Sequence, residues 1–240
     1  LDGLNHRLSL SGKVKGRVND LRLSDLNFAF GNQTRYRGYA SIQGLPDLES
    51  SFIHLDAKQF TTDYRDLLSI PTYPFREGGK LPLPEELKLL GRISFKGKFD
   101  GFLSDFTTYG KFNTAIGNAD TRLSLRLGEK KSDIEYHGKL STENFDLGKL
   151  LGIGGLNALS MSWELDGTGS DLESLAAGFN FDIRNLAYNM YNYKHIRVRG
   201  HFENKIFNGM LVSLDSNVNF DFNGSVDFNK KVPDLQFIST

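Results

Sequence analysis

Apolar and polar residues alternate one by one along most of this chain. From Leu8 to Val18 every even position is apolar or glycine, whereas every odd position carries a serine, lysine or arginine. The clearest case is the segment 218–228, in which Val, Phe and Gly alternate with Asn, Asp and Ser. Because successive side chains of a β-strand point to opposite faces of a sheet, each such segment predicts a strand with one apolar and one polar face.

The same alternation predicts further strands in the segments 93–99, 122–127, 134–140, 161–165, 179–183 and 196–202. Residues that favour chain reversal lie between the runs and predict antiparallel neighbours. These predicted turns are Gly31–Asn32, Gly117–Asn118, 128–131 and Asn208–Gly209.

Helical signals are few and short. The segment 84–91 begins with proline and ends with glycine, which is typical of a two-turn helix. Single turns are expected at Tyr64–Ile70 and Leu147–Leu151, capped by Asp63 and Asp146. The sequence therefore predicts an all-β fold, an extended antiparallel sheet with few short helices.

Prolines mark one division of the chain. Four of the six fall between residues 71 and 84, which predicts a Pro-rich linker with a short helix at 71–90. It separates a first β-segment, 1–70, from a longer one, 91–240, that continues the same sheet. The chain begins without methionine and ends in a strand-like run, so we expect it to be a middle section of a longer protein.

Composition narrows the possible functions. The 29 basic and 29 acidic side chains balance, which argues against nucleic acid as a partner. Cysteine is absent, and this excludes disulfides, thiolate metal sites and cysteine nucleophiles. The chain holds 25 glycines and 19 phenylalanines, and several glycines share the apolar strand face with the phenylalanines. Glycine at these positions leaves gaps that let a sheet bend or a ligand approach.

Catalytic signatures are not found in the sequence. The five histidines do not form an HExxH or comparable metal-binding pattern, and no GxSxG elbow is present. The aspartates lie mainly in turns and on polar strand faces. We therefore expect no enzyme activity, no metal and no cofactor.

Several segments resemble a known family. These are 91–99 (GRISFKGKF), Ser104–Phe106, 141–152 (STENFDLGKLLG), 188–196 (YNMYNYKHI) and 215–228 (DSNVNFDFNGSVDF). They are similar to the TamB proteins of the AsmA-like superfamily, and the resemblance runs from about Gly12 to the end of the chain. Its elements are structural repeats and not catalytic motifs.

The resemblance implies a curved antiparallel sheet that forms an open, β-taco-like groove. It also implies a periplasmic segment of a bridge protein whose inner-membrane anchor lies outside this chain. Such proteins are thought to carry phospholipid acyl chains along the groove and to support outer-membrane assembly. An Omp85-class outer-membrane barrel is the implied partner, contacted through parts outside this chain.

Alternation and resemblance together give a set of residues expected to line the groove. These are Val14, Val18, Phe95, Phe99, Leu123, Leu125, Phe179, Phe181, Val198, Phe202, Phe220, Phe222 and Phe228.

The same pattern allows an alternative. An apolar sheet face is covered by a second sheet, by helices or by a ligand. If a second sheet covers it, these residues are ordinary core. The chain would then be a closed β-sandwich binding module, such as an adhesin or glycan-binding domain, and the aromatic cluster Tyr188–Tyr193 would be its recognition site.

Overall fold

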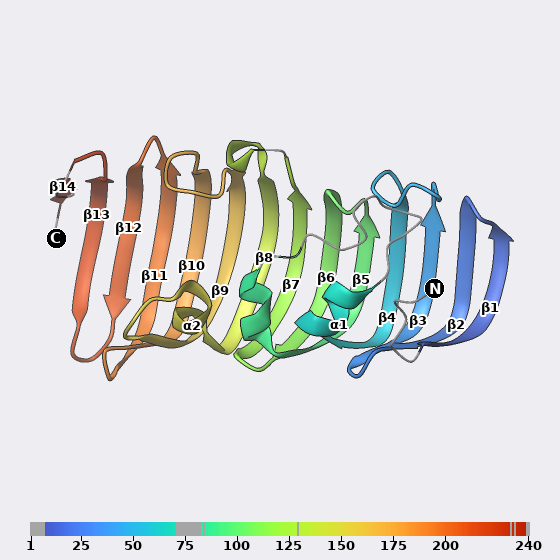
Figure 1. The fold of residues 1–240 in the computed structure, drawn as a ribbon. Coiled ribbons are helices and arrows are strands. Elements are labelled where there is room, and N and C mark those ends of the chain that lie inside the picture. The colour runs from blue at the N-terminus through green and yellow to red at the C-terminus, as the bar shows by residue number, and fades with distance from the viewer. Residues whose placement is uncertain are drawn as a thin grey trace. The chain divides into compact units, whose positions relative to one another are not determined.

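The strands of this protein are hydrogen-bonded to one another in the order in which they occur in the chain, β1 to β14 (Figure 1). The computed structural model describes residues 8–70, 83, 85–128, 130–230, 232 and 234–238. Every register that it gives is antiparallel. The predicted all-β class is confirmed: the described strands form an open antiparallel sheet with β1 and β14 at its edges, and the helices of the described residues are short.

The chain divides into two compact units, which we describe separately. Unit 1 is Leu1–Asp120 and unit 2 is Thr121–Thr240, so strand β7 (Gly117–Arg126) contributes to both. Residues 71–82 and 84, which include all four prolines of the predicted linker, lie outside the described residues. The predicted division at 71–90 stays a prediction.

The described residues of unit 1 form six strands before β7, one α-helix and one 3-10 helix. They are β1 (Leu8–Arg17), β2 (Asp20–Phe30), β3 (Thr34–Gln43), β4 (Phe52–Asp63), α1 (Tyr64–Ser69), η1 (Glu85–Leu90), β5 (Arg92–Gly101) and β6 (Asp105–Thr114). Helix α1 begins where the sequence predicts, because the carboxylate of Asp63 accepts a hydrogen bond from the backbone N–H of Asp66 at 2.8 Å. Helix η1 lies where a short helix is predicted and is of the 3-10 type.

The centre of the apolar face of unit 1 is buried by its own side chains, whereas apolar residues in and just after β1 stay exposed. The register aligns Phe60 with Phe95 and Phe95 with Phe112. Because opposed residues on neighbouring strands share a face, the three rings lie on the same face of the sheet. The rings of Phe95 and Phe112 are 4.5 Å apart. The core of unit 1 is a buried cluster of Leu26, Tyr36, Ala40, Ala57 and Phe95.

Unit 2 continues from β7 with seven further strands. They and its helices are η2 (Lys131–Asp133), β8 (Glu135–Asp146), α2 (Leu147–Leu151), β9 (Leu156–Thr168), β10 (Ala176–Tyr188), β11 (Tyr191–Glu203), β12 (Ile206–Leu214), β13 (Asn219–Asp227) and β14 (Asp234–Ile238). Helix α2 is capped by Asp146, as predicted, and ends at Gly152 in the left-handed conformation.

Two predicted turns are wrong. Asn208 and Gly209 lie inside β12, and the reversal between β11 and β12 is made by Asn204 and Lys205, both with positive φ. Asn tolerates the left-handed conformation, which explains why a turn without glycine forms there. The pair Gly117–Asn118 begins β7, and the turn occupies the two residues before it. The predicted turn at Gly31–Asn32 is confirmed.

Candidate functional site

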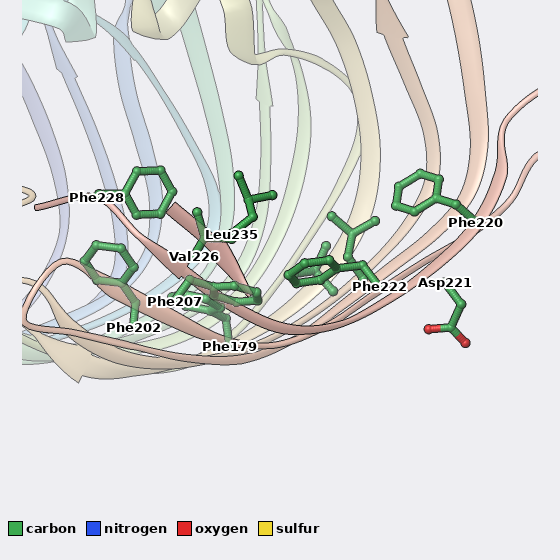
Figure 2. A pocket seen from close by; sticks show the side chains of 11 residues that line it. Phe179, Phe202, Phe207, Phe220, Asp221, Phe222, Val226, Phe228 and Leu235 are labelled. Carbon is green, nitrogen blue, oxygen red and sulfur yellow. The ribbon is translucent and has the colours of Figure 1, made fainter. Parts of the chain in front are cut away.

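An open hollow of about 820 Å³ lies on the apolar face of unit 2, over strands β10 to β14 (Figure 2). We call it the trough. Ten of its eleven lining residues are apolar, and the exception is Asp221. The lining residues are Phe179, Val198, Phe202, Phe207, Leu211, Phe220, Asp221, Phe222, Val226, Phe228 and Leu235.

Strand alternation explains this composition. Phe220 and Phe222 stand on the inner side of the curved sheet, whereas the carboxylate of Asp221 between them points away from it (Figure 2). The pleat places neighbouring side chains on opposite faces, so the trough receives only the apolar half of the pattern. Phe220 is 43% exposed and Leu235 55% exposed, which leaves much apolar surface in contact with solvent.

A row of glycines crosses the floor of the trough. Gly200 on β11 faces Gly209 on β12, which faces Gly224 on β13. We call this row the crease. Each of the three strands has a bulky residue two positions before its glycine and another two positions after it. These flanking residues are Val198 and Phe202, Phe207 and Leu211, and Phe222 and Val226, and all six line the trough.

The crease needs glycine because the strands approach closely there. A Cβ atom placed on Gly209 would lie 2.2 Å from the carbonyl oxygen of Arg199 and 2.7 Å from the Cα of Gly200. Real Cβ contacts are longer than this, so a larger residue would push the strands apart. Glycine inside strands marks such close approaches and tight bends. Glycine at the crease therefore permits close approach of the backbones, and the positions over Gly200 and Gly209 are covered by the ring of Phe207 rather than left as an open gap.

Aromatic rings continue from the trough toward β9. The ring of Phe179 lies 6.0 Å from that of Phe207 and 5.3 Å from that of Phe181, with nearly parallel planes. Phe181 meets Trp163 on β9 edge to face at 5.8 Å. Among the described residues, the indole Nε1 of Trp163 is a buried polar atom without a hydrogen-bond partner. The apolar face therefore extends one strand beyond the hollow, to β9.

Six residues of the predicted groove set line the trough, and the other seven lie elsewhere. The six are Phe179, Val198, Phe202, Phe220, Phe222 and Phe228. Phe181 does not line the trough, but its ring packs on that of Phe179, which does.

The remaining six predicted residues lie in unit 1 and on β7. Phe95 is only 8% exposed and belongs to the core cluster of unit 1, and the ring of Phe99 packs on Phe106 at 4.9 Å. Val14 and Val18 are 60% and 64% exposed. Leu123 and Leu125 on β7 are half-buried.

Five lining residues were not predicted from the sequence: the four apolar residues Phe207, Leu211, Val226 and Leu235, and Asp221. In β12 apolar residues occupy both faces, since Ile206, Met210 and Val212 alternate with Phe207 and Leu211. This run hides the period of two. The signal that finds Phe207 is the spacing of two from Gly209, which repeats as Phe95 and Gly97 on β5.

The polar face of unit 2 carries cross-strand ion pairs. Lys139 pairs with Glu164 at 3.2 Å and His137 with Asp166 at 2.8 Å, each pair joining opposed positions of β8 and β9. Both pairs are exposed, and an exposed ion pair such as that of Lys139 with Glu164 contributes about 0–1 kcal/mol. These paired polar side chains make this face of the sheet compatible with solvent.

Two buried carboxylates fix turns and take no part in the trough. Asp66 accepts hydrogen bonds from the backbone N–H groups of Gln33 at 2.6 Å, Thr34 at 2.8 Å and Asn32 at 3.3 Å. Burial alone raises the pKa of the Asp66 carboxyl, but these bonds outweigh it and hold the pKa below its ordinary value.

Asp215 has the same function between β12 and β13. The hydroxyl of Tyr191 donates to its Oδ1 at 2.6 Å, and the backbone N–H groups of Asn217 and Lys194 donate at 2.9 Å. The bond from Tyr191, followed by that from Asn217, holds the pKa of the Asp215 carboxyl below its ordinary value. Tyr191 also packs edge to face on Tyr193, with ring centroids 4.6 Å apart.

Within the described ranges, no three His, Asp or Glu side chains gather closely enough to hold a metal ion. Among the described residues, no helix is long and apolar enough to cross a bilayer. Comparison with known protein families, with curated proteins and with solved structures finds no match to this chain.

Proposed function

We propose that the trough of unit 2 holds phospholipid acyl chains, and that the protein is a segment of a TamB-like bridge carrying lipid between two membranes. The observation that carries this proposal is the trough itself, about 820 Å³ of open hollow lined by ten apolar side chains. Ligand pockets usually combine apolar walls with a few polar groups that fix orientation. The only polar residue of this lining points its carboxylate away, which favours a ligand that is itself purely apolar.

The free energy of transferring an acyl chain is compatible with a carrier function. Each methylene moved from water into an apolar site is worth roughly 0.8 kcal/mol, so a sixteen-carbon chain gains on the order of 10 kcal/mol in the trough. The same chain in a bilayer is already out of water. Transfer between bilayer and trough is therefore close to balanced, and this permits both uptake and release.

A glycan-binding β-sandwich is less well supported. A closed sandwich packs two sheets face to face at about 10 Å. In the described part of unit 2, the strands form one layer, and the substantial contact beyond adjacent strands is that of α2 with β9. Tyr191 and Tyr193 meet edge to face and Tyr191 is tied to Asp215, so the two rings do not form a flat stacking platform.

The wider setting belongs to the proposal and rests on the sequence resemblance. It comprises a periplasmic location, an inner-membrane anchor outside this chain, a contribution to outer-membrane assembly and an Omp85-class barrel partner.

A charge placed in the trough tests the proposal. Phe222→Asp puts a carboxylate among the apolar walls, and Asn223→Asp is a matched control that adds the same charge on the opposite face of the same strand. A phospholipid with a conjugated tetraene in its acyl chain reports binding, because it accepts excitation energy from Trp163, the only tryptophan. We expect energy transfer in the wild type and in Asn223→Asp and its loss in Phe222→Asp. Equal transfer in the two variants, or none in the wild type together with no lipid in native mass spectra, contradicts the proposal.

A further inference from the structure

The ring of Phe207 occupies the crease. Its Cε2 atom lies 2.6 Å from the position of a Cβ on Gly200, and its Cζ atom lies 2.8 Å from the position of a Cβ on Gly209. The ring thus fills the volume that side chains at these two glycines would take. It is nearly parallel to the ring of Phe179, at 7°. Figure 2 shows both rings next to the ribbon, on the floor of the trough.

Unit 1 contains the same arrangement in a closed form. Gly97 and Gly110 face each other, and a Cβ on either would lie 2.8 Å from the ring of Phe95. There the ring is buried in the core cluster. A ring over a glycine pair is therefore a device by which this sheet covers exposed backbone. Phe207 differs from Phe95 because it lines an open hollow, where a ligand competes for the same volume.

We propose that Phe207 limits how deeply an acyl chain sinks into the trough and so speeds the release of the chain. This inference rests on the proposed function. With the ring in place, a ligand contacts the upper walls and the face of the ring. Without it, the glycine floor at Gly200 and Gly209 becomes accessible, and a chain buries more of its length.

The crease is a short apolar gap along each strand, bounded by bulky side chains. On β12 the walls are Phe207 and Leu211, four residues apart with Gly209 midway, which is about 13 Å between Cα atoms at roughly 3.3 Å per residue. The side chains of the two walls occupy part of this span, so the room between them is narrower than the distance between the Cα atoms. An extended peptide does not fit chemically, because the backbone groups of the floor are paired within the sheet and its own amides would be buried without partners.

The direction of one mutational effect tests the inference. Phe207→Ala and Phe222→Ala both remove one benzyl-sized side chain from the lining. Each additional methylene that a chain buries slows release about fourfold. If two or three more become buried, Phe207→Ala slows dissociation of the tetraene phospholipid about 15- to 60-fold, whereas Phe222→Ala accelerates it. Lengthening the probe's acyl chain also prolongs residence more in Phe207→Ala than in the wild type.

Faster release from Phe207→Ala, as from Phe222→Ala, overturns the inference. If Phe222→Asp still abolishes binding in that case, the proposed function stands without it. A wild type that binds no probe removes both. Should Phe207→Ala lose its β-sheet circular dichroism, Phe207→Leu keeps an apolar side chain but withdraws the ring from the glycines. The same slowing is then expected at a smaller size, and unchanged or faster release from Phe207→Leu counts against the inference.

Discussion

One added methyl group at Gly209 is expected to destabilise unit 2, whereas the same group at Gly178 is not. Both glycines lie inside strands of this unit but on opposite faces of the sheet. A Cβ on Gly209 meets two backbone atoms of β11, at 2.2 and 2.7 Å. A Cβ on Gly178 has no neighbour closer than 4.0 Å. The two Gly→Ala variants thus share their chemistry and differ only in the space around the methyl group.

The magnitudes follow from that space. Overpacking that moves backbone is expected to cost about 1–3 kcal/mol at Gly209. Replacing glycine with alanine stabilises a chain by about 0.4–1 kcal/mol when the conformation is compatible, because the unfolded state loses freedom. Net destabilisation of about 1–2 kcal/mol is therefore expected for Gly209→Ala. Gly178→Ala is expected to gain about 0.5 kcal/mol.

Urea unfolding followed by circular dichroism and by Trp163 fluorescence measures both effects. At an unchanged slope m, the midpoint falls for Gly209→Ala and rises slightly for Gly178→Ala. Midpoints that move together in the same direction would refute the idea that the crease is a close backbone approach. A urea midpoint that falls only for Gly178→Ala would also refute it, because the close contact would then lie on the polar face of the sheet and not at the crease.

Two further predictions concern groups away from the trough. Asp66→Asn is expected to lose about 1–3 kcal/mol, because an amide cannot accept all the N–H bonds that the carboxylate accepts. Since the folded pKa of Asp66 lies below its unfolded value, its contribution is present above about pH 4 and is lost as the pH falls through the folded pKa. Urea midpoints at neutral and acidic pH check this, and a variant as acid-sensitive as the wild type counts against it. Burial, with a smaller contribution from Asp56, raises the pKa of Tyr36 to about 12 from 10.0, so stability is expected to fall between these pH values. Tyr36→Phe should remove that part of the alkaline fall, and an identical fall in the variant would contradict the assignment.

Period-two patterning predicts the strands and the composition of the trough because each depends only on the alternation of side chains between faces. The segment 218–228 is a clear case, since β13 and its two trough phenylalanines follow directly from it. The helix caps at Asp63 and Asp146 are equally local.

Features that depend on the register between neighbouring strands could not be predicted from the sequence. The crease exists because Gly200, Gly209 and Gly224 become aligned. The turn at Asn204 and Lys205, which contains no glycine, sets the alignment of Gly200 with Gly209, and the connection between β12 and β13 sets that of Gly209 with Gly224. The same limit explains Phe95. Phe95 alternates with polar residues on β5 as the trough phenylalanines do on their strands. It is nevertheless buried, because side chains on the neighbouring strands pack against it.

The pairing of each strand with its neighbours in the chain has a consequence for how such a protein grows and folds. A quasi-one-dimensional array of this kind draws its stability from nearest-neighbour interfaces, as solenoid proteins do. Because contacts within each unit join hairpins close in sequence, assembly can begin at any hairpin and spread outward with little loop-closure entropy. Adding or deleting a whole hairpin then changes the length of the sheet while leaving the remaining interfaces as they were. Gene duplication can thus lengthen such a sheet without the redesign of a shared core.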